Sequence, residues 1–209
     1  MRFRNRAEAG RRLAAELAAY GGRVDVVVLG LPRGGVPVAV EVARALHAAL
    51  DVFVVRKLGA PGHPELAMGA IASGGVRVLS RDIIDELGIR APAIDAVTAR
   101  ERIELERRDR LYRGGRQLPD LRDRTVIVVD DGLATGATME AAVQAVRLCG
   151  PARVVVGTPV GAAEACHRLR RVADEVVCTQ TPEPFRAVGL WYEQFEPTTD
   201  EEVISLLRE

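Results

Sequence analysis

The feature that most constrains the fold is the alternation of short apolar runs with longer segments of helical periodicity. A strand with one solvent-exposed face alternates apolar and polar residues, and these runs do not. They are therefore typical of strands that helices cover on both faces. Strands joined through helices form a mostly parallel sheet. The sequence therefore predicts an α/β fold, with strands at Val24–Leu29, Val52–Val55, Val126–Val129, Val154–Gly157 and Glu175–Cys178.

Length and composition favour one domain over residues 1–209. Basic and acidic residues number 29 each, so no net positive field indicates nucleic acid as a partner. No apolar stretch reaches the roughly 20 residues of a membrane helix, and no secretory apolar region follows Met1–Arg6. We expect a cytoplasmic protein without a membrane partner. Cys149, Cys166 and Cys178 contain no C-x-x-C pair and are interpreted as free thiols.

Residues 57–80 do not continue the alternation of apolar runs and helical segments. Gly59–Pro64 is rich in glycine and proline, and we expect it to lack regular structure. Ala67–Ala72 and Val76–Leu79 flank Ser73–Gly75 as the two arms of a hairpin. The pattern predicts a flexible flap.

The stretch Val126–Thr138, VIVVDDGLATGAT, joins an apolar strand to two aspartates and a loop of small residues. Adjacent carboxylates suit hydroxyl groups or a cation, whereas a small-residue loop that opens a helix suits a phosphate. A sugar phosphate satisfies both halves. The loop lacks the lysine of G-x-x-x-x-G-K-[ST], and Gly30–Gly35 does not have the spacing of G-x-G-x-x-G.

This stretch resembles the thirteen-residue phosphoribosyl pyrophosphate signature of type I phosphoribosyltransferases, and the likeness extends over nearly the whole chain. The most similar branch is a bacterial group of predicted phosphoribosyltransferases whose acceptor is not evident. The resemblance implies a Rossmann-like parallel sheet flanked by helices, with a flexible hairpin flap and a small hood from the chain ends. It also implies a homodimer.

The resemblance implies catalytic roles for Asp130, Asp131, Arg33 and Lys57, the only lysine in the chain. The two aspartates would bind the ribose hydroxyls and Mg²⁺, directly or through water. The 5-phosphate would lie in the loop that contains Leu133, Ala134, Thr135, Gly136, Ala137 and Thr138. Pyrophosphate would contact Pro32, Arg33, Gly34, Gly35, Arg56 and Lys57.

The acceptor would lie under the hood, residues 180–209, where Val188, Trp191 and Phe185 are the candidate contacts. Aromatic side chains there, including Tyr192, could stack on a planar ring or simply pack the tail onto the sheet. Relatives that use 6-oxopurines commonly carry a lysine after the last core strand, and Cys178–Thr181 has none. A hypoxanthine or guanine acceptor is therefore in doubt.

The expected activity is transfer of a 5-phosphoribosyl group from phosphoribosyl pyrophosphate to a nitrogenous base, such as a purine or pyrimidine, with release of pyrophosphate. Two alternatives stay open at this point. The first is a regulator that binds the same ligand without turnover, as some members of the family do. The second is a nucleotide-binding sheet protein of another family.

Overall fold

The computed structural model describes residues 2–208, so positions 1 and 209 of the predicted domain and hood lie outside the described residues. At its centre is a five-stranded parallel sheet in the order β2-β1-β6-β7-β8. The middle strand β6 therefore lies between β1 and β7, with Leu29 opposite Val128. The predicted α/β class is confirmed by β1 (Val26–Gly30), β2 (Ala49–Val52), β6 (Thr125–Val129), β7 (Arg153–Val160) and β8 (Glu175–Gln180).

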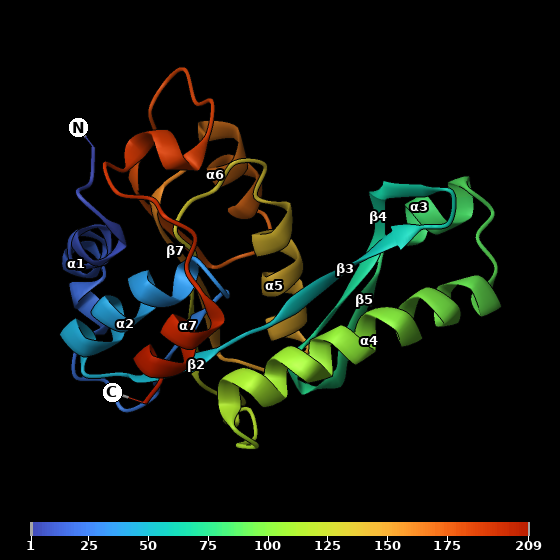
Figure 1. Cartoon of the computed structure of the whole chain (residues 1–209), viewed down its shortest axis with the longest axis horizontal. Helices are drawn as coiled ribbons and strands as arrows, with labels where there is room; N and C mark the ends of the chain where they lie inside the picture. The colour runs from blue at the N-terminus through green and yellow to red at the C-terminus, as the bar shows by residue number, and fades with distance from the viewer. Residues whose placement is uncertain (1, 209) are drawn as a thin grey trace.

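Helices cover both faces of this sheet (Figure 1). Val28 packs in an apolar cluster with α1 and α2, whereas its neighbour Leu29 packs with α5 and α6. This alternation explains why the strands are apolar at successive positions. No helix within residues 2–208 combines the length and apolar character that crossing a membrane requires. The covering helices are α1 (Arg6–Glu16), α2 (Gly35–Leu46), α5 (Ala137–Arg147) and α6 (Ala163–Leu169).

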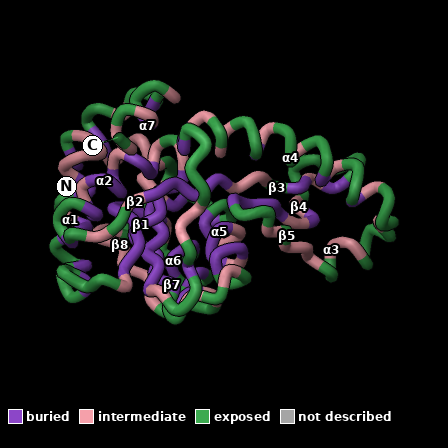
Figure 2. Tube along the Cα trace, turned by 90° about the horizontal axis from the view of Figure 1, so that it is seen from below, coloured by how far each residue is buried: buried purple, intermediate pink, exposed green. Residues whose placement is uncertain are grey.

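An arm projects from the main sheet (Figure 1). It contains a second, antiparallel sheet in the order β3-β4-β5, and α4 runs alongside it. Leu58, Met68 and Leu105 are buried in one apolar cluster, which also contains Val36 and Val40 of α2, so the arm shares its core with the main body. Much of the outer side of α4 is exposed (Figure 2). The elements are β3 (Val55–Ala60), β4 (His63–Ala72), β5 (Val76–Leu79), α3 (Arg81–Glu86) and α4 (Ala91–Arg113).

The predicted hairpin of Ala67–Ala72 with Val76–Leu79 is confirmed by the pairing of β4 with β5. The prediction that Gly59–Pro64 lacks regular structure is wrong, because β3 pairs with β4 through this segment. A side chain at Gly59 would come within 2.6 Å of the Pro64 carbonyl oxygen, and Gly62 has φ 79° in the turn. The glycines serve a tight hairpin. Mobility of residues 57–80 stays a prediction.

The predicted strand at Val52–Val55 is also wrong as a single element. β2 ends at Val52 and β3 begins at Val55, so this apolar run crosses from the main sheet into the arm. The preceding helix ends at Leu46 because His47 adopts a left-handed φ of 53°, which frees the next residues to form β2. Periodicity does not separate two short strands that share one apolar run.

A buried polar network ties the arm to the main sheet. Nε of Arg113 on α4 donates to Asp51 Oδ1 at 3.1 Å, and Nη1 donates to Asp109 Oδ1 at 2.5 Å. Nη2 of the same guanidinium donates to the Val52 carbonyl oxygen. Ser73 Oγ donates to Asp109 Oδ1 at 2.7 Å. Because Arg113 is only 5% exposed, these bonds satisfy a charge that is removed from water.

The N-terminal segment pairs with the C-terminal segment around Trp191, and together they form the predicted hood. Phe3 N donates to the Trp191 carbonyl oxygen at 2.8 Å, and Glu193 N donates to the Phe3 carbonyl oxygen at 2.8 Å. The rings of Phe3 and Tyr192 lie 5.5 Å apart between centroids. Short helices occupy Val188–Trp191 (η3) and Asp200–Leu206 (α7). The second of these leaves the hood and packs near α2 and α4 (Figure 1).

Candidate functional site

The acidic pair lies directly after the central strand β6, at the carboxyl edge where parallel sheets bind ligands. Asp131 N donates to Asp130 Oδ1 at 2.9 Å. Burial raises the pKa of both carboxyl groups, and the neighbouring charge of Asp131 raises the pKa of Asp130 further. The Arg6 guanidinium opposes this shift in the pKa of Asp131. Two partly buried, adjacent carboxylates form a place that favours a cation or hydroxyl donors.

The loop that follows presents backbone N–H groups at the start of α5. Gly136 has φ 71° at the helix N-cap, a conformation that glycine adopts without steric cost. Leu133 is buried and anchors the loop, since its N–H donates to the Val160 carbonyl oxygen at 2.9 Å. The remaining predicted 5-phosphate contacts, Ala134, Thr135, Ala137 and Thr138, are exposed. A helix N-terminus that opens to solvent in this way suits a terminal phosphate.

The loop after β1 lies against the acidic pair. A Cβ at Gly34 would overlap Asp131 Oδ2, and a Cβ at Gly35 would come within 2.6 Å of the Val129 carbonyl oxygen. The Pro32–Arg33 peptide bond is cis. The structure therefore brings the predicted pyrophosphate loop next to the predicted ribose contacts, and only glycine permits this approach.

A Gly34→Ala variant tests this approach. Gly34 has φ −61°, which alanine adopts freely, so the only cost is the collision with the Asp131 carboxylate. We expect at least about a tenfold loss of affinity for phosphoribosyl pyrophosphate in a calorimetric titration, since displacing one hydrogen bond to a charged group costs about 1.5–3 kcal/mol. Gly21→Ala is a control, because Gly21 also has a negative φ, −65°, and a Cβ there would come no closer than 3.2 Å, to the Ala18 carbonyl oxygen. Equal losses in both variants would contradict the expectation.

The predicted cationic residues are not gathered around one point. Arg33 is exposed, and its Nη1 lies 3.8 Å from Asp200 Oδ1 on α7. Arg56 lies inside β3, where Nη2 donates to Glu101 Oε2 on α4 at 2.6 Å. Lys57 is exposed, and alternation along the strand directs it to the opposite face of β3 from Arg56. A pyrophosphate role for Arg56 requires exchange of its Glu101 partner.

Asp200 was not predicted as a site residue. Its Oδ1 accepts a 2.7 Å hydrogen bond from Tyr112 Oη, and burial together with this bond raises the pKa of Tyr112 to about 12. The Asp200 carboxylate, at the start of α7, therefore connects Tyr112 on α4 with Arg33 in the predicted pyrophosphate loop. Asp200 is near Arg33 because α7, some 170 residues further along the chain, lies beside the loop that contains Arg33. No local sequence pattern around either residue indicates this contact.

The predicted acceptor residues lie in the hood, over the acidic loop. Val188 contacts Gly132 so closely that a Cβ on the glycine would overlap its methyl groups. Phe185 and Trp191 are partly buried and pack on the cluster that contains Phe3. Among the described residues, Trp191 Nε1 is a buried donor without a hydrogen-bond partner. Tyr192 is only 4% exposed, so its ring is not available for stacking on a ligand.

Two residues that were not predicted to lie at the donor site contact Asp131: Arg6, and Tyr192, which was predicted only as a possible stacking residue of the hood. Arg6 Nε donates to Asp131 Oδ2 at 2.8 Å, and Tyr192 Oη donates to the Asp131 carbonyl oxygen at 2.6 Å. Burial and the nearby Asp131 charge raise the pKa of Tyr192, so it remains a donor. The aromatic tail carried a signal for Tyr192, whereas Arg6 resembles the other arginines near the N-terminus in sequence.

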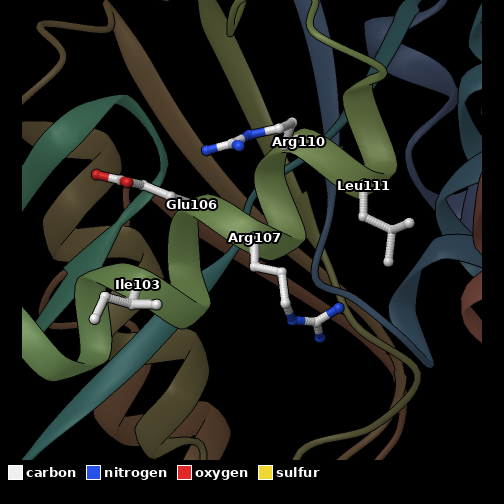
Figure 3. Close-up of a pocket in the computed structure, with 5 residues that line it drawn as sticks. All are labelled: Ile103, Glu106, Arg107, Arg110 and Leu111. Atoms are coloured by element: carbon white, nitrogen blue, oxygen red, sulfur yellow. The ribbon is translucent and has the colours of Figure 1, made fainter.

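A hollow of about 490 Å³ lies elsewhere, along the outer side of α4 (Figure 3). None of the predicted site residues lines it, and all of its lining side chains come from this single helix. It is therefore a surface depression, separate from the acidic loop. The lining residues are Ile103, Glu106, Arg107, Arg110 and Leu111.

Comparison with known proteins identifies the class that this fold and site define. The sequence profile of the phosphoribosyl transferase domain matches residues 2–192. The chain belongs to the phosphoribosyl transferase domain family. The resemblance to phosphoribosyltransferases is thereby confirmed, together with the expected fold.

The individual relatives agree with this assignment. The Mycobacterium tuberculosis protein named "Putative phosphoribosyl transferase Rv0571c" is 51% identical over 205 residues, which are 98% of this chain and 46% of that protein. This chain thus spans about half the length of that curated relative. The crystal structure of TT1426 from Thermus thermophilus is 48% identical, with a TM-score of 0.90 over 99% of this chain and 98% of that chain. The AQ2163 protein from Aquifex aeolicus shares the fold at 14% identity, with a TM-score of 0.52 over 88% of this chain and 78% of that chain.

Proposed function

We propose that this chain transfers a 5-phosphoribosyl group from phosphoribosyl pyrophosphate to a nitrogenous base. One observation carries the proposal: the Gly34–Gly35 loop contacts the Asp130–Asp131 pair, which leads directly into the open N-terminus of α5. A pyrophosphate, two ribose hydroxyls and a 5-phosphate would each find suitable partners along this path. The C1–oxygen bond to pyrophosphate breaks, the C1–nitrogen bond forms, and the acceptor nitrogen releases its proton to water.

Each predicted group has a defined task in this proposal. Asp130 and Asp131 accept hydrogen bonds from the ribose hydroxyls, and the α5 amides hold the 5-phosphate. Arg33 and Lys57 offset the charge that develops on the departing pyrophosphate. The hood over Gly132 excludes water from C1 of the ribose. The hood also holds the acceptor close to this carbon.

The residues also fit the Mg²⁺ that the family implies. Among residues 2–208, no three His, Cys, Asp or Glu side chains are grouped as a metal site. Mg²⁺ is often held by one or two carboxylates with substrate phosphates and water, which is the contribution that Asp130 and Asp131 would make. When bound, the ion would neutralise charge on the pyrophosphate.

The acceptor is proposed to be a planar purine, pyrimidine or related base. The unpartnered Trp191 Nε1 supports this, because an indole N–H is a donor only and would pair with a ring nitrogen or carbonyl oxygen. Packing of Trp191 and Phe185 in the hood leaves stacking by either ring as a proposal. A second chain in a homodimer is proposed from the family resemblance alone.

The test is an assay of pyrophosphate release. The protein is incubated with phosphoribosyl pyrophosphate and Mg²⁺, with each base of a panel in turn. We expect at least one base to release pyrophosphate above the rate seen without acceptor. If the protein binds the donor but releases pyrophosphate with none of the bases, the result favours the non-catalytic regulator. The Arg56–Glu101 ion pair supports this alternative, because it occupies the guanidinium of a predicted pyrophosphate contact.

A further inference from the structure

Arg6, at the start of α1, makes three contacts with groups far along the chain. Its Nε donates to Asp131 Oδ2 at 2.8 Å, and its Nη1 donates to the Glu196 carbonyl oxygen at 2.8 Å. The guanidinium carbon lies 3.9 Å from the centroid of the Phe195 ring. The side chain of Arg6 is 12% exposed and that of Asp131 15% exposed. One side chain thus joins the acidic pair to the hood.

We propose that Arg6 is a positioning residue of the donor site, which holds the Asp131 carboxylate in one orientation and couples it to the acceptor hood. This inference rests on the proposed function. The Nε–Oδ2 bond fixes one oxygen of Asp131. A carboxylate has about four acceptor positions, so the others remain available to ribose hydroxyls.

The coupling follows a continuous set of contacts. Phe195, under the Arg6 guanidinium, stacks on Tyr192 with 4.9 Å between ring centroids. Tyr192 Oη in turn donates to the Asp131 carbonyl oxygen at 2.6 Å. Asp131 is therefore held through its side chain by Arg6 and through its main chain by the residue that follows Trp191. A ligand that moves Asp131 will change the surroundings of Trp191.

Packing alone does not account for an arginine at this position. An apolar side chain would cover the Phe195 ring without the cost of removing a charge from water. The planar fork of arginine, in contrast, serves a carboxylate and a carbonyl oxygen at once. Lysine would keep the charge near Asp131, but its compact ammonium lacks the planar fork with which Nε and Nη1 of Arg6 reach two separate acceptors.

The first measurement is the affinity for phosphoribosyl pyrophosphate with Mg²⁺, by calorimetry, in the full chain. We expect Arg6→Gln to lose about 10- to 100-fold in affinity, because a hydrogen bond to a charged group is removed and Asp131 is no longer oriented. Arg6→Lys should recover part of this loss. Arg11→Gln is the matched control, since Arg11 lies on the same helix, is 59% exposed and pairs with Glu41 at 3.4 Å, away from the acidic pair. Equal affinity in Arg6→Gln and Arg11→Gln would overturn the positioning role.

The second measurement uses the fluorescence of Trp191, the only tryptophan in the chain. The wild-type protein and Arg11→Gln should change emission when phosphoribosyl pyrophosphate and Mg²⁺ saturate the site. Arg6→Gln at saturation should show a much smaller change. Arg6→Lys should remain closer to Arg6→Gln, because it lacks the planar fork that reaches Asp131 and Glu196 from two nitrogens. A wild-type emission that donor binding leaves unchanged would overturn the coupling.

Thermal melts of the variants separate these effects from unfolding. If Arg6→Gln does not fold, Arg6→Lys alone tests the inference. Wild-type donor affinity together with a wild-type fluorescence change in Arg6→Lys would overturn it. Failure of the wild-type protein to bind phosphoribosyl pyrophosphate would instead defeat the proposed function, and the role of Arg6 with it. Binding by the wild-type protein with unaltered Arg6 variants would defeat only the role of Arg6.

Discussion

Replacing both Asp130 and Asp131 with asparagine is expected to lower the affinity for phosphoribosyl pyrophosphate by about 10²- to 10⁴-fold. Each carboxylate would accept a hydrogen bond from a ribose hydroxyl, and a hydrogen bond to a charged group contributes about 1.5–3 kcal/mol. The amides also lose the charge that a Mg²⁺ ion requires. Calorimetric titration of the donor, with and without Mg²⁺, measures the loss.

Asp123→Asn is the control for this variant. Asp123 is exposed and lies just before β6, at the opposite end of the strand from the acidic pair. Its φ is 57°, a conformation that asparagine tolerates, so the fold should be unaffected. The single variant Asp130→Asn should not lower the free energy of unfolding, because it removes a buried charge that the adjacent Asp131 charge repels. Unchanged donor affinity in the double variant would contradict the assignment of the acidic pair.

Replacing Arg113 with methionine is expected to lower the free energy of unfolding by about 3–5 kcal/mol, the usual cost of removing one partner from a buried ion pair. The change would leave Asp51, which is 6% exposed, without its guanidinium partner. It would also remove the donor to the Val52 carbonyl oxygen, where the chain passes from the main sheet toward the arm. Urea denaturation followed by circular dichroism measures the loss.

Arg107→Met on the same helix is the control. Arg107 is 54% exposed, and its ion pair is with Glu104, three residues earlier. An exposed pair of this kind contributes about 0.2–1 kcal/mol. Similar losses for the two variants would show that α4 responds to any arginine substitution, and would contradict the role of the buried network.

The sequence predicted most of the main sheet because its strands carry their own signal. β1, β6 and β7 are buried at nearly every position. β8 has three successive apolar residues, Val176–Cys178, which are partly buried against the two faces of the sheet. Val126–Thr138 likewise contains its strand, acidic pair and loop within one continuous stretch, so the local pattern was sufficient to predict the order of strand, loop and helix there. The ligand contacts of these residues stay a prediction.

The arm was harder to predict because its pattern depends on partners elsewhere. Gly59 and Pro64 are typical of loops in isolation, but in the structure they face each other across a tight hairpin. Val52–Val55 has the pattern of one strand, but in the structure β2 of the main sheet ends at Val52 and β3 of the arm begins at Val55. The contacts of Arg6 and Asp200 join residues that are 125 or more positions apart, which spacing within a short window does not reveal.

The most direct test of the donor site is competition between phosphoribosyl pyrophosphate and its two fragments. A calorimetric titration of the wild-type protein with the donor and Mg²⁺ is repeated in the presence of ribose 5-phosphate, and again in the presence of pyrophosphate. Because the Gly34–Gly35 loop lies against Asp131 and the chain continues from Asp131 into the N-terminus of α5, we expect each fragment to weaken donor binding separately. A donor that does not bind, or one that neither fragment displaces, would contradict the account.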